Sequence, residues 1–189
     1  GVIAQFFYVG VQIMCWTFII QYGTRLFMAE GMAEQEAEVL SQKYNIVAMV
    51  IFCISRFVCT FMLRFINPGM LLKILAIAGA CFTMGVIFFQ NIWGLYCLVA
   101  VSACMSLMFP TIYGIALNKL GDDAKFGAAG LIMAILGGSV LPPLQASIID
   151  MHTVLGMPAV NVSFVLPFIC FIVIIIYGHR SYARSKMLK

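Results

Sequence analysis

Charged residues are scarce in this sequence. Only 10% of its 189 residues are Asp, Glu, Lys or Arg, whereas 63% are apolar, and the mean hydropathy is +1.07. A soluble globular domain averages about 25% charged and about 45–50% apolar residues. The composition therefore excludes a water-soluble globular core, and we expect no nucleic-acid partner.

Acidic residues are missing from the middle of every long apolar stretch. Asp150 lies at the end of one stretch, where we expect it to cap the helix or to be solvated. The sequence also has no Ser/His/Asp arrangement, no pair of metal ligands and no phosphate-binding loop. We therefore expect no enzyme activity, no metal and no cofactor. Any acid that carries a proton must lie outside this chain.

Disulfides and metal–thiolate sites are not expected either. All seven cysteines lie inside apolar runs, and their spacing does not fit a metal site. We expect them to act as small apolar packing groups. They are Cys15, Cys53, Cys59, Cys81, Cys97, Cys104 and Cys170.

Six apolar stretches have the length of a membrane span, which needs roughly 20 mostly apolar residues. They cover about 2–22, 45–65, 70–89, 92–117, 127–149 and 160–178. We predict an all-α membrane protein in which residues 1–189 form one six-helix transmembrane domain. Short loops join antiparallel neighbours, and the longest loop, 24–44, comes after the first span.

Positive charge is distributed unequally between the two sides of these spans. The side with segments 64–73, 118–126 and 179–189 carries eight Lys and Arg residues, and the other side carries two, Arg25 and Lys43. Cytoplasmic loops carry the excess of Lys and Arg, so we expect both chain ends to be cytoplasmic. The chain starts inside its first span without a methionine, and we expect it to be half of a larger protein.

Small residues and prolines mark where the spans should pack and bend. Close helix contacts in lipid rely on small residues, which the fifth span carries at spacings of four. The sixth span is uniformly bulky, and we predict a peripheral helix that faces lipid. Prolines inside spans should bend or break them. These are Pro110, Pro142, Pro143 and Pro167.

Polar and aromatic side chains share one helical face in the first, second and fourth spans, at 100° per residue. The three groups are Gln5, Gln12 and Trp16; Asn45, Phe52 and Arg56; and Ser102, Phe109 and Tyr113. Aromatic faces pack on the C–H face of a sugar, and amides donate to and accept from its hydroxyls. The pattern favours a cavity for a polyhydroxylated ligand. Interhelical hydrogen bonding with ordinary aromatic packing is the alternative.

Arg56 is the one cation deep inside a span. A charge at this depth is costly and marks a functional site by default. Arg56 would orient a substrate, or it would hold a gate by pairing with backbone carbonyls or with an acid on a missing partner. A purely structural tie is the alternative.

Several motifs occur in a fixed order along the chain. They are Gly1-Val2-Ile3-Ala4-Gln5-Phe6, Cys15-Trp16-Thr17-Phe18, Ser55-Arg56-Phe57, Met105-Ser106-Leu107-Met108-Phe109-Pro110-Thr111-Ile112, Asn118-Lys119-Leu120-Gly121, Lys125-Phe126-Gly127 and Gly137-Gly138. Taken in order along essentially the whole chain, they resemble the seventh, eighth, tenth and eleventh helices of the L-fucose:proton symporter family. That family belongs to the major facilitator superfamily.

The resemblance implies the C-terminal six-helix half of a twelve-helix transporter in a bacterial inner membrane. Such transporters move L-fucose, glucose or galactose with protons by alternating access, and the proton-carrying acids lie in the N-terminal half. The expected partners are therefore a sugar, protons, the N-terminal half and the lipid bilayer. A relative has tyrosine where this chain has Phe109, which leaves hexoses other than fucose open.

The residues and the resemblance together predict a substrate site with nearby gates. The substrate-binding residues are Gln12, Trp16, Phe52, Arg56, Phe109 and Tyr113. The gating or hinge residues are Arg64, Pro110, Gly137, Gly138 and Pro142. Trp16, Phe52 and Phe109 would form apolar walls, and Gln12 would bind sugar hydroxyls. The alternatives are a transporter of a drug or an organic acid, which the low cavity charge disfavours, and a structural membrane subunit.

Overall fold

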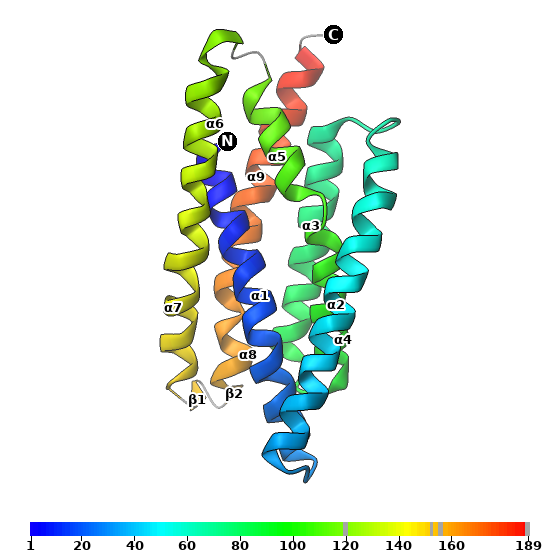
Figure 1. Ribbon diagram of the computed structural model, residues 1–189, viewed down its shortest axis with the longest axis vertical. Helices are drawn as coiled ribbons and strands as arrows, with labels where there is room; N and C mark the ends of the chain where they lie inside the picture. The colour runs from blue at the N-terminus through cyan, green and yellow to red at the C-terminus, as the bar shows by residue number, and fades with distance from the viewer. Residues whose placement is uncertain (119–120, 152, 155–156, 188–189) are drawn as a thin grey trace.

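Long antiparallel helices form an elongated bundle in the computed structural model, and both chain ends lie toward the same end of it (Figure 1). The structure describes residues 1–118, 121–151, 153–154 and 157–187. Within these residues, six helical segments are long and apolar enough to cross a membrane. The predicted all-α fold with six spans is confirmed.

Three spans are single helices, and three are assembled from shorter pieces. The single helices are α1 (Val2–Ala29), α2 (Glu34–Met62) and α3 (Pro68–Phe88). The fourth span consists of α4 (Ile92–Met105) and α5 (Met108–Leu117). The fifth joins α6 (Ala124–Met133) to α7 (Gly137–Ile149), and the sixth joins α8 (Ala159–Ser163) to α9 (Val165–Met187). Two short antiparallel strands, β1 (Thr153–Val154) and β2 (Met157–Pro158), connect the last two spans.

Two of the predicted proline breaks occur. Pro110 and Pro167 each lie a few residues past a break, after α4 and after α8. A proline cannot donate to the carbonyl four residues earlier, and its ring clashes with that carbonyl. Pro142 and Pro143 do not break their span, because both lie inside a continuous α7, and a bend at these two residues stays a prediction. The departure from α-helix is the 3₁₀ turn Ala134–Leu136, upstream of both prolines.

The long loop predicted over 24–44 is also wrong, because only residues 30–33 connect α1 to α2. Both helices extend past their apolar stretches. Glu34 and Glu36 lie in the first turn of α2, where the helix dipole favours acidic side chains. Gly31 has a φ of +95°, a conformation that glycine adopts at no steric cost, and it closes the tight connection.

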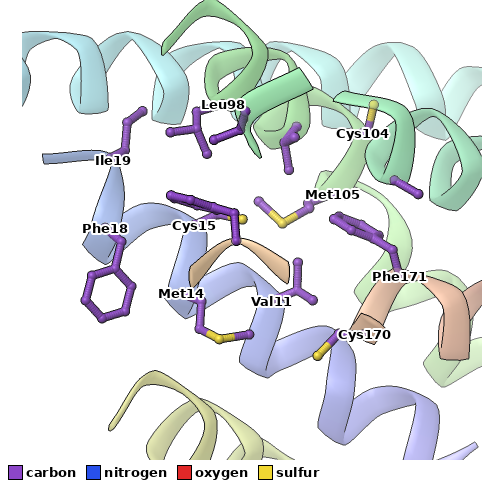
Figure 2. Packing of buried hydrophobic residues seen from close by; sticks show 14 of the residues in the cluster. Val11, Met14, Cys15, Phe18, Ile19, Leu98, Cys104, Met105, Cys170 and Phe171 are labelled. Carbon is purple, nitrogen blue, oxygen red and sulfur yellow. The ribbon is translucent and has the colours of Figure 1, made fainter. Parts of the chain in front are cut away.

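The core surrounds α1, which packs against α2, α4, α7 and α9. Figure 2 shows its central layer, where Cys15 of α1 lies near Met105 of α4 and Phe171 of α9 lies on the other side of Met105. All seven cysteines are free, and Cys15 is one of those packed in this apolar layer.

The prediction of a peripheral sixth span is wrong. Helix α9 packs along α3 and α1 and buries Cys170, Phe171 and Ile174. Its bulky rings fit against small residues: a Cβ on Gly79 of α3 would lie 2.7 Å from Phe171 Cε1. The spans that bury little are the second, at 11% of its apolar window, and the fifth, at 22%, whereas the other four bury 44–61%.

Candidate functional site

The first part of the site lies between α1 and α2. The rings of Trp16 and Phe52 meet edge to face, with centroids 5.0 Å apart and planes at 81°. Closer to the α1–α2 connection, the helices approach closely because Gly23 faces Ser41, whose Oγ would lie 2.5 Å from a Cβ on Gly23. Gln12 lies one turn from Trp16 on α1, and both side chains are half-buried.

A second aromatic group joins α1 to α5. Phe109 and Tyr113, one turn apart on α5, stack with centroids 6.4 Å apart and planes at 9°. The Tyr8 ring of α1 meets Phe109 at 6.1 Å and 64°. The Tyr8 hydroxyl donates to the carbonyl oxygen of Met105 over 2.9 Å. Sequence reasoning missed Tyr8, although its spacing of four from Gln12 places it on the same face of α1.

Arg56 places a positive charge beside these rings. It lies one turn from Phe52 on α2 and is exposed on the six-helix unit. A guanidinium in a membrane span faces a polar interior or a water-filled cavity rather than hydrocarbon. We therefore expect the side of α2 that carries Arg56 to face a polar interior rather than lipid.

The six predicted substrate-binding residues lie on α1, α2 and α5 as two aromatic pairs, one amide (Gln12) and one cation (Arg56), and α1 packs against both of the other helices. The structure does not bring in every residue of the predicted faces. Gln5 is fully buried, and neither of its carboxamide atoms has a partner among the described residues. Ser102 is buried and donates to Leu98 O of its own helix over 3.4 Å. Both side chains point into the six-helix bundle instead.

Two buried polar atoms, one on α1 and one on α2, are unpaired. Trp16 Nε1 and Asn45 Oδ1 are buried and have no hydrogen-bond partner within the described part of the chain. Buried polar atoms without partners are rare in native proteins, and a functional role is one accepted reason for them. Trp16 therefore offers a donor and Asn45 an acceptor in addition to their apolar surfaces.

The predicted hinge residues occupy three different places. Arg64 is exposed in the turn after α2. This turn is tied at Asn67, which accepts from Gly69 N over 3.0 Å and donates to Ser185 Oγ over 2.7 Å. Pro110 lies in the first turn of α5, directly after the break.

Gly137, Gly138 and Pro142 lie where α7 packs on α1. A Cβ on Gly137 would overlap the carbonyl oxygen of Phe6, and a Cβ on Gly138 would lie 3.1 Å from Val9 Cγ1. Pro142 is half-buried beside this contact. These positions explain why small residues are needed for helix packing. The hinge roles of all five residues remain predictions.

The site is an open surface on this chain. Two pockets, of about 350 and 740 Å³, lie elsewhere, and none of the six residues lines either of them. Among the described residues, no group of three or more His, Cys, Asp or Glu side chains could hold a metal ion. The arrangement offers aromatic faces, amides and one cation, which suit binding of a polar, uncharged ring.

Known proteins resemble the chain over nearly its whole length. It is 54% identical to the L-fucose-proton symporter of Haemophilus influenzae, over 100% of this chain and 42% of that protein. It is 31% identical to the L-fucose-proton symporter of Escherichia coli, over 94% of this chain and 38% of that protein. A glucose/galactose transporter of Brucella abortus is 28% identical over 94% of this chain and 40% of its own length.

A solved structure shows the same fold. The crystal structure of the major facilitator superfamily transporter FucP in the outward conformation matches with a TM-score of 0.83 and 30% identity, covering 95% of this chain and 41% of FucP. No protein-family model matches the chain. The chain thus spans about two fifths of the length of these relatives, and it corresponds to their C-terminal part. It belongs to the L-fucose:proton symporter family of the major facilitator superfamily.

Proposed function

We propose that the chain is the C-terminal half of a sugar:proton symporter and that its site forms one wall of the sugar cavity. The observation that carries the proposal is that the Trp16–Phe52 pair and the Phe109–Tyr113 pair both pack on α1, with Arg56 one turn from Phe52 on α2. Relatives named as L-fucose-proton symporters and a glucose/galactose transporter support the substrate class.

Different side chains would make different kinds of contact with the sugar. Trp16, Phe52 and Phe109 provide apolar walls against the C–H face of the ring. Gln12 donates to and accepts from the hydroxyls, and the unpaired indole N–H of Trp16 adds a donor. Arg56 orients the sugar from the open side of α2, or it stabilises the state that is closed toward the cytoplasm.

L-fucose is the sugar that we propose first. It carries a methyl group where glucose and galactose carry a hydroxymethyl group, and a wall made of three aromatic rings binds a methyl group without leaving a hydroxyl unpaired. The identity of 54% with a fucose symporter, against 28% with a glucose/galactose transporter, points the same way.

The missing parts of the transporter lie in an N-terminal half. The second and fifth spans bury 11% and 22% of their apolar windows, and we propose that they pack against that half. The acid that carries the proton lies there as well, because the carboxylates of this chain lie at the ends of its spans.

We further propose that both ends of the chain are cytoplasmic, in a bacterial inner membrane. The α2–α3 turn, the α5–α6 connection and the end of α9 lie at the same end of the bundle as Gly1 (Figure 1). These segments carry most of the Lys and Arg residues, which fits the excess of positive charge on the cytoplasmic side.

Uptake into vesicles tests the proposal. The full-length transporter, reconstituted with an imposed inward proton gradient, should accumulate labelled L-fucose, and collapsing the gradient with an ionophore should abolish accumulation. Labelled glucose, galactose and an organic acid form the comparison panel. Accumulation of none of the sugars would refute the substrate class, whereas accumulation of glucose or galactose alone would refute only the choice of L-fucose.

A further inference from the structure

Side chains from two other helices form hydrogen bonds to the backbone at the break between α4 and α5. The last four carbonyls of an α-helix lack partners inside that helix, and in α4 these belong to residues 102–105. Two of the four carbonyl oxygens accept hydroxyl donors. Tyr8 of α1 donates to Met105 O over 2.9 Å, and Ser55 of α2 donates to Ala103 O over 3.0 Å.

A third hydroxyl extends this set of hydrogen bonds. Ser106, the residue at the break, donates to Ser55 Oγ over 3.1 Å, so that Ser106, Ser55 and Ala103 O form a continuous chain of hydrogen bonds from α4 to α2 and back. Ser106 N adds a bond to Ala103 O over 3.3 Å. Tyr8 and Ser106 are fully buried, and the bond from Tyr8 to Met105 O is shielded from water, whereas Ser55 is half-buried.

Pro110 removes one helical hydrogen bond at the break. Pro110 has no N–H for the carbonyl of Ser106, and its ring crowds that carbonyl. The direction in which α5 leaves α4 is therefore not fixed by the main chain alone. It depends on what holds the freed carbonyls, and the position of Phe109, whose ring packs against Tyr8, changes with that direction.

We propose that Tyr8 and Ser55 are positioning residues. Their hydroxyls fix the end of α4 at the break and thereby set where Phe109 stands against the sugar ring. This inference rests on the proposed function, because the role of Phe109 is a sugar-binding one. Neither hydroxyl needs to touch the sugar.

The chain provides matched controls. Tyr22, also on α1 and buried, donates its hydroxyl to Phe89 O near the α3–α4 connection, far from the break. Ser41 on α2 donates to Ala37 O of its own helix over 2.7 Å. Tyr8→Phe is compared with Tyr22→Phe, and Ser55→Ala with Ser41→Ala. Ser55→Thr keeps a hydroxyl and serves as the rescue variant.

The test uses the full-length transporter and two measurements. Amide hydrogen exchange over 105–112 reports local opening of the break. Losing one buried hydrogen bond should speed exchange there on the order of tenfold in Tyr8→Phe and Ser55→Ala, but not in the controls or in Ser55→Thr. Sugar uptake should show KM raised about threefold to tenfold at a nearly unchanged maximal rate, whereas a loss of folded protein would lower the maximal rate alone.

Unchanged exchange in both Tyr8→Phe and Ser55→Ala would overturn the inference. Faster exchange with an unchanged KM would overturn it as well, because the break would then not position a sugar contact. If the unmodified transporter accumulated no sugar, the proposed function would fail first, and that result differs from active variants that behave like their controls.

Discussion

Replacing Trp16 with phenylalanine should separate sugar binding from folding. Trp16 meets Phe52 edge to face at 5.0 Å, and its buried Nε1 has no partner among the described residues. Phenylalanine keeps an aromatic ring for that contact and removes only the donor and the second ring. The fold loses no hydrogen bond, whereas the sugar loses a donor if the indole N–H is the group that binds it.

The expected effect on the KM for sugar differs from the expected effect on the unfolding midpoint. A neutral hydrogen bond contributes about 0.5–1.5 kcal/mol, so the KM for sugar should rise about threefold to tenfold. For the fold, removing an unpaired buried donor is favourable, and this gain offsets part of the stability that is lost with the volume of the larger ring. The midpoint of thermal unfolding should therefore move by only about 2–4 °C, the shift per kcal/mol for a chain of this size. Trp16→Ala should also lose the aromatic pair, about 0.5–1.5 kcal/mol beyond burial.

The assay measures KM in reconstituted vesicles and the unfolding midpoint of the same preparation. Trp93 supplies the control, because it is 65% exposed on α4 and also pairs edge to face, with Tyr96. Trp93→Phe should leave KM unchanged. If Trp16→Phe gives the KM of the unmodified protein, the indole N–H does not bind sugar. A fall in the unfolding midpoint with no change in KM would make Trp16 a packing residue.

Three further predictions concern other parts of the chain. Gly137→Ala should lower the unfolding midpoint by several degrees, since overpacking costs about 1–3 kcal/mol. The control Gly114→Ala should not lower it, because nothing lies within 4 Å of an added Cβ there. Equal midpoints for the two variants would contradict the close α1–α7 contact. Arg56→Gln should reduce sugar uptake at least tenfold with normal folding, and unchanged uptake would remove Arg56 from the site. Asp150→Asn should leave proton-driven accumulation intact, and loss of coupling would place the proton acid in this half.

The helical period was enough to place the candidate residues on shared helix faces, because that grouping depends on local spacing, and their role in a site stays a prediction. Trp16 comes one turn after Gln12, and Tyr113 comes one turn after Phe109, so a rotation of 100° per residue groups each pair. The position of Arg56 deep inside a span could be predicted from the length of the apolar stretch around it. The all-α fold could be predicted from the same lengths.

What the sequence did not predict depends on contacts between distant segments. The bond from Tyr8 to Met105 O joins residues 97 positions apart, and no local pattern specifies it. The burial of α9 depends on small residues in α3, such as Gly79, which admit the ring of Phe171. Gln5 belongs to the predicted polar face of α1 but is buried in the bundle, because neighbouring helices rather than the helical period decide how much of a face is covered.

The exposure of Arg56 and the low burial of α2 have one physical explanation. A guanidinium facing hydrocarbon would cost several kcal/mol even by the mildest scales, so the surface around Arg56 must meet polar groups or water in the membrane. The six-helix unit supplies few of them on that side, where α2 presents exposed Ile54, Phe57 and Val58 beside the cation. The proposed N-terminal half would cover the apolar part of this surface and leave Arg56 facing a hydrated space, which is where the proposed sugar site lies.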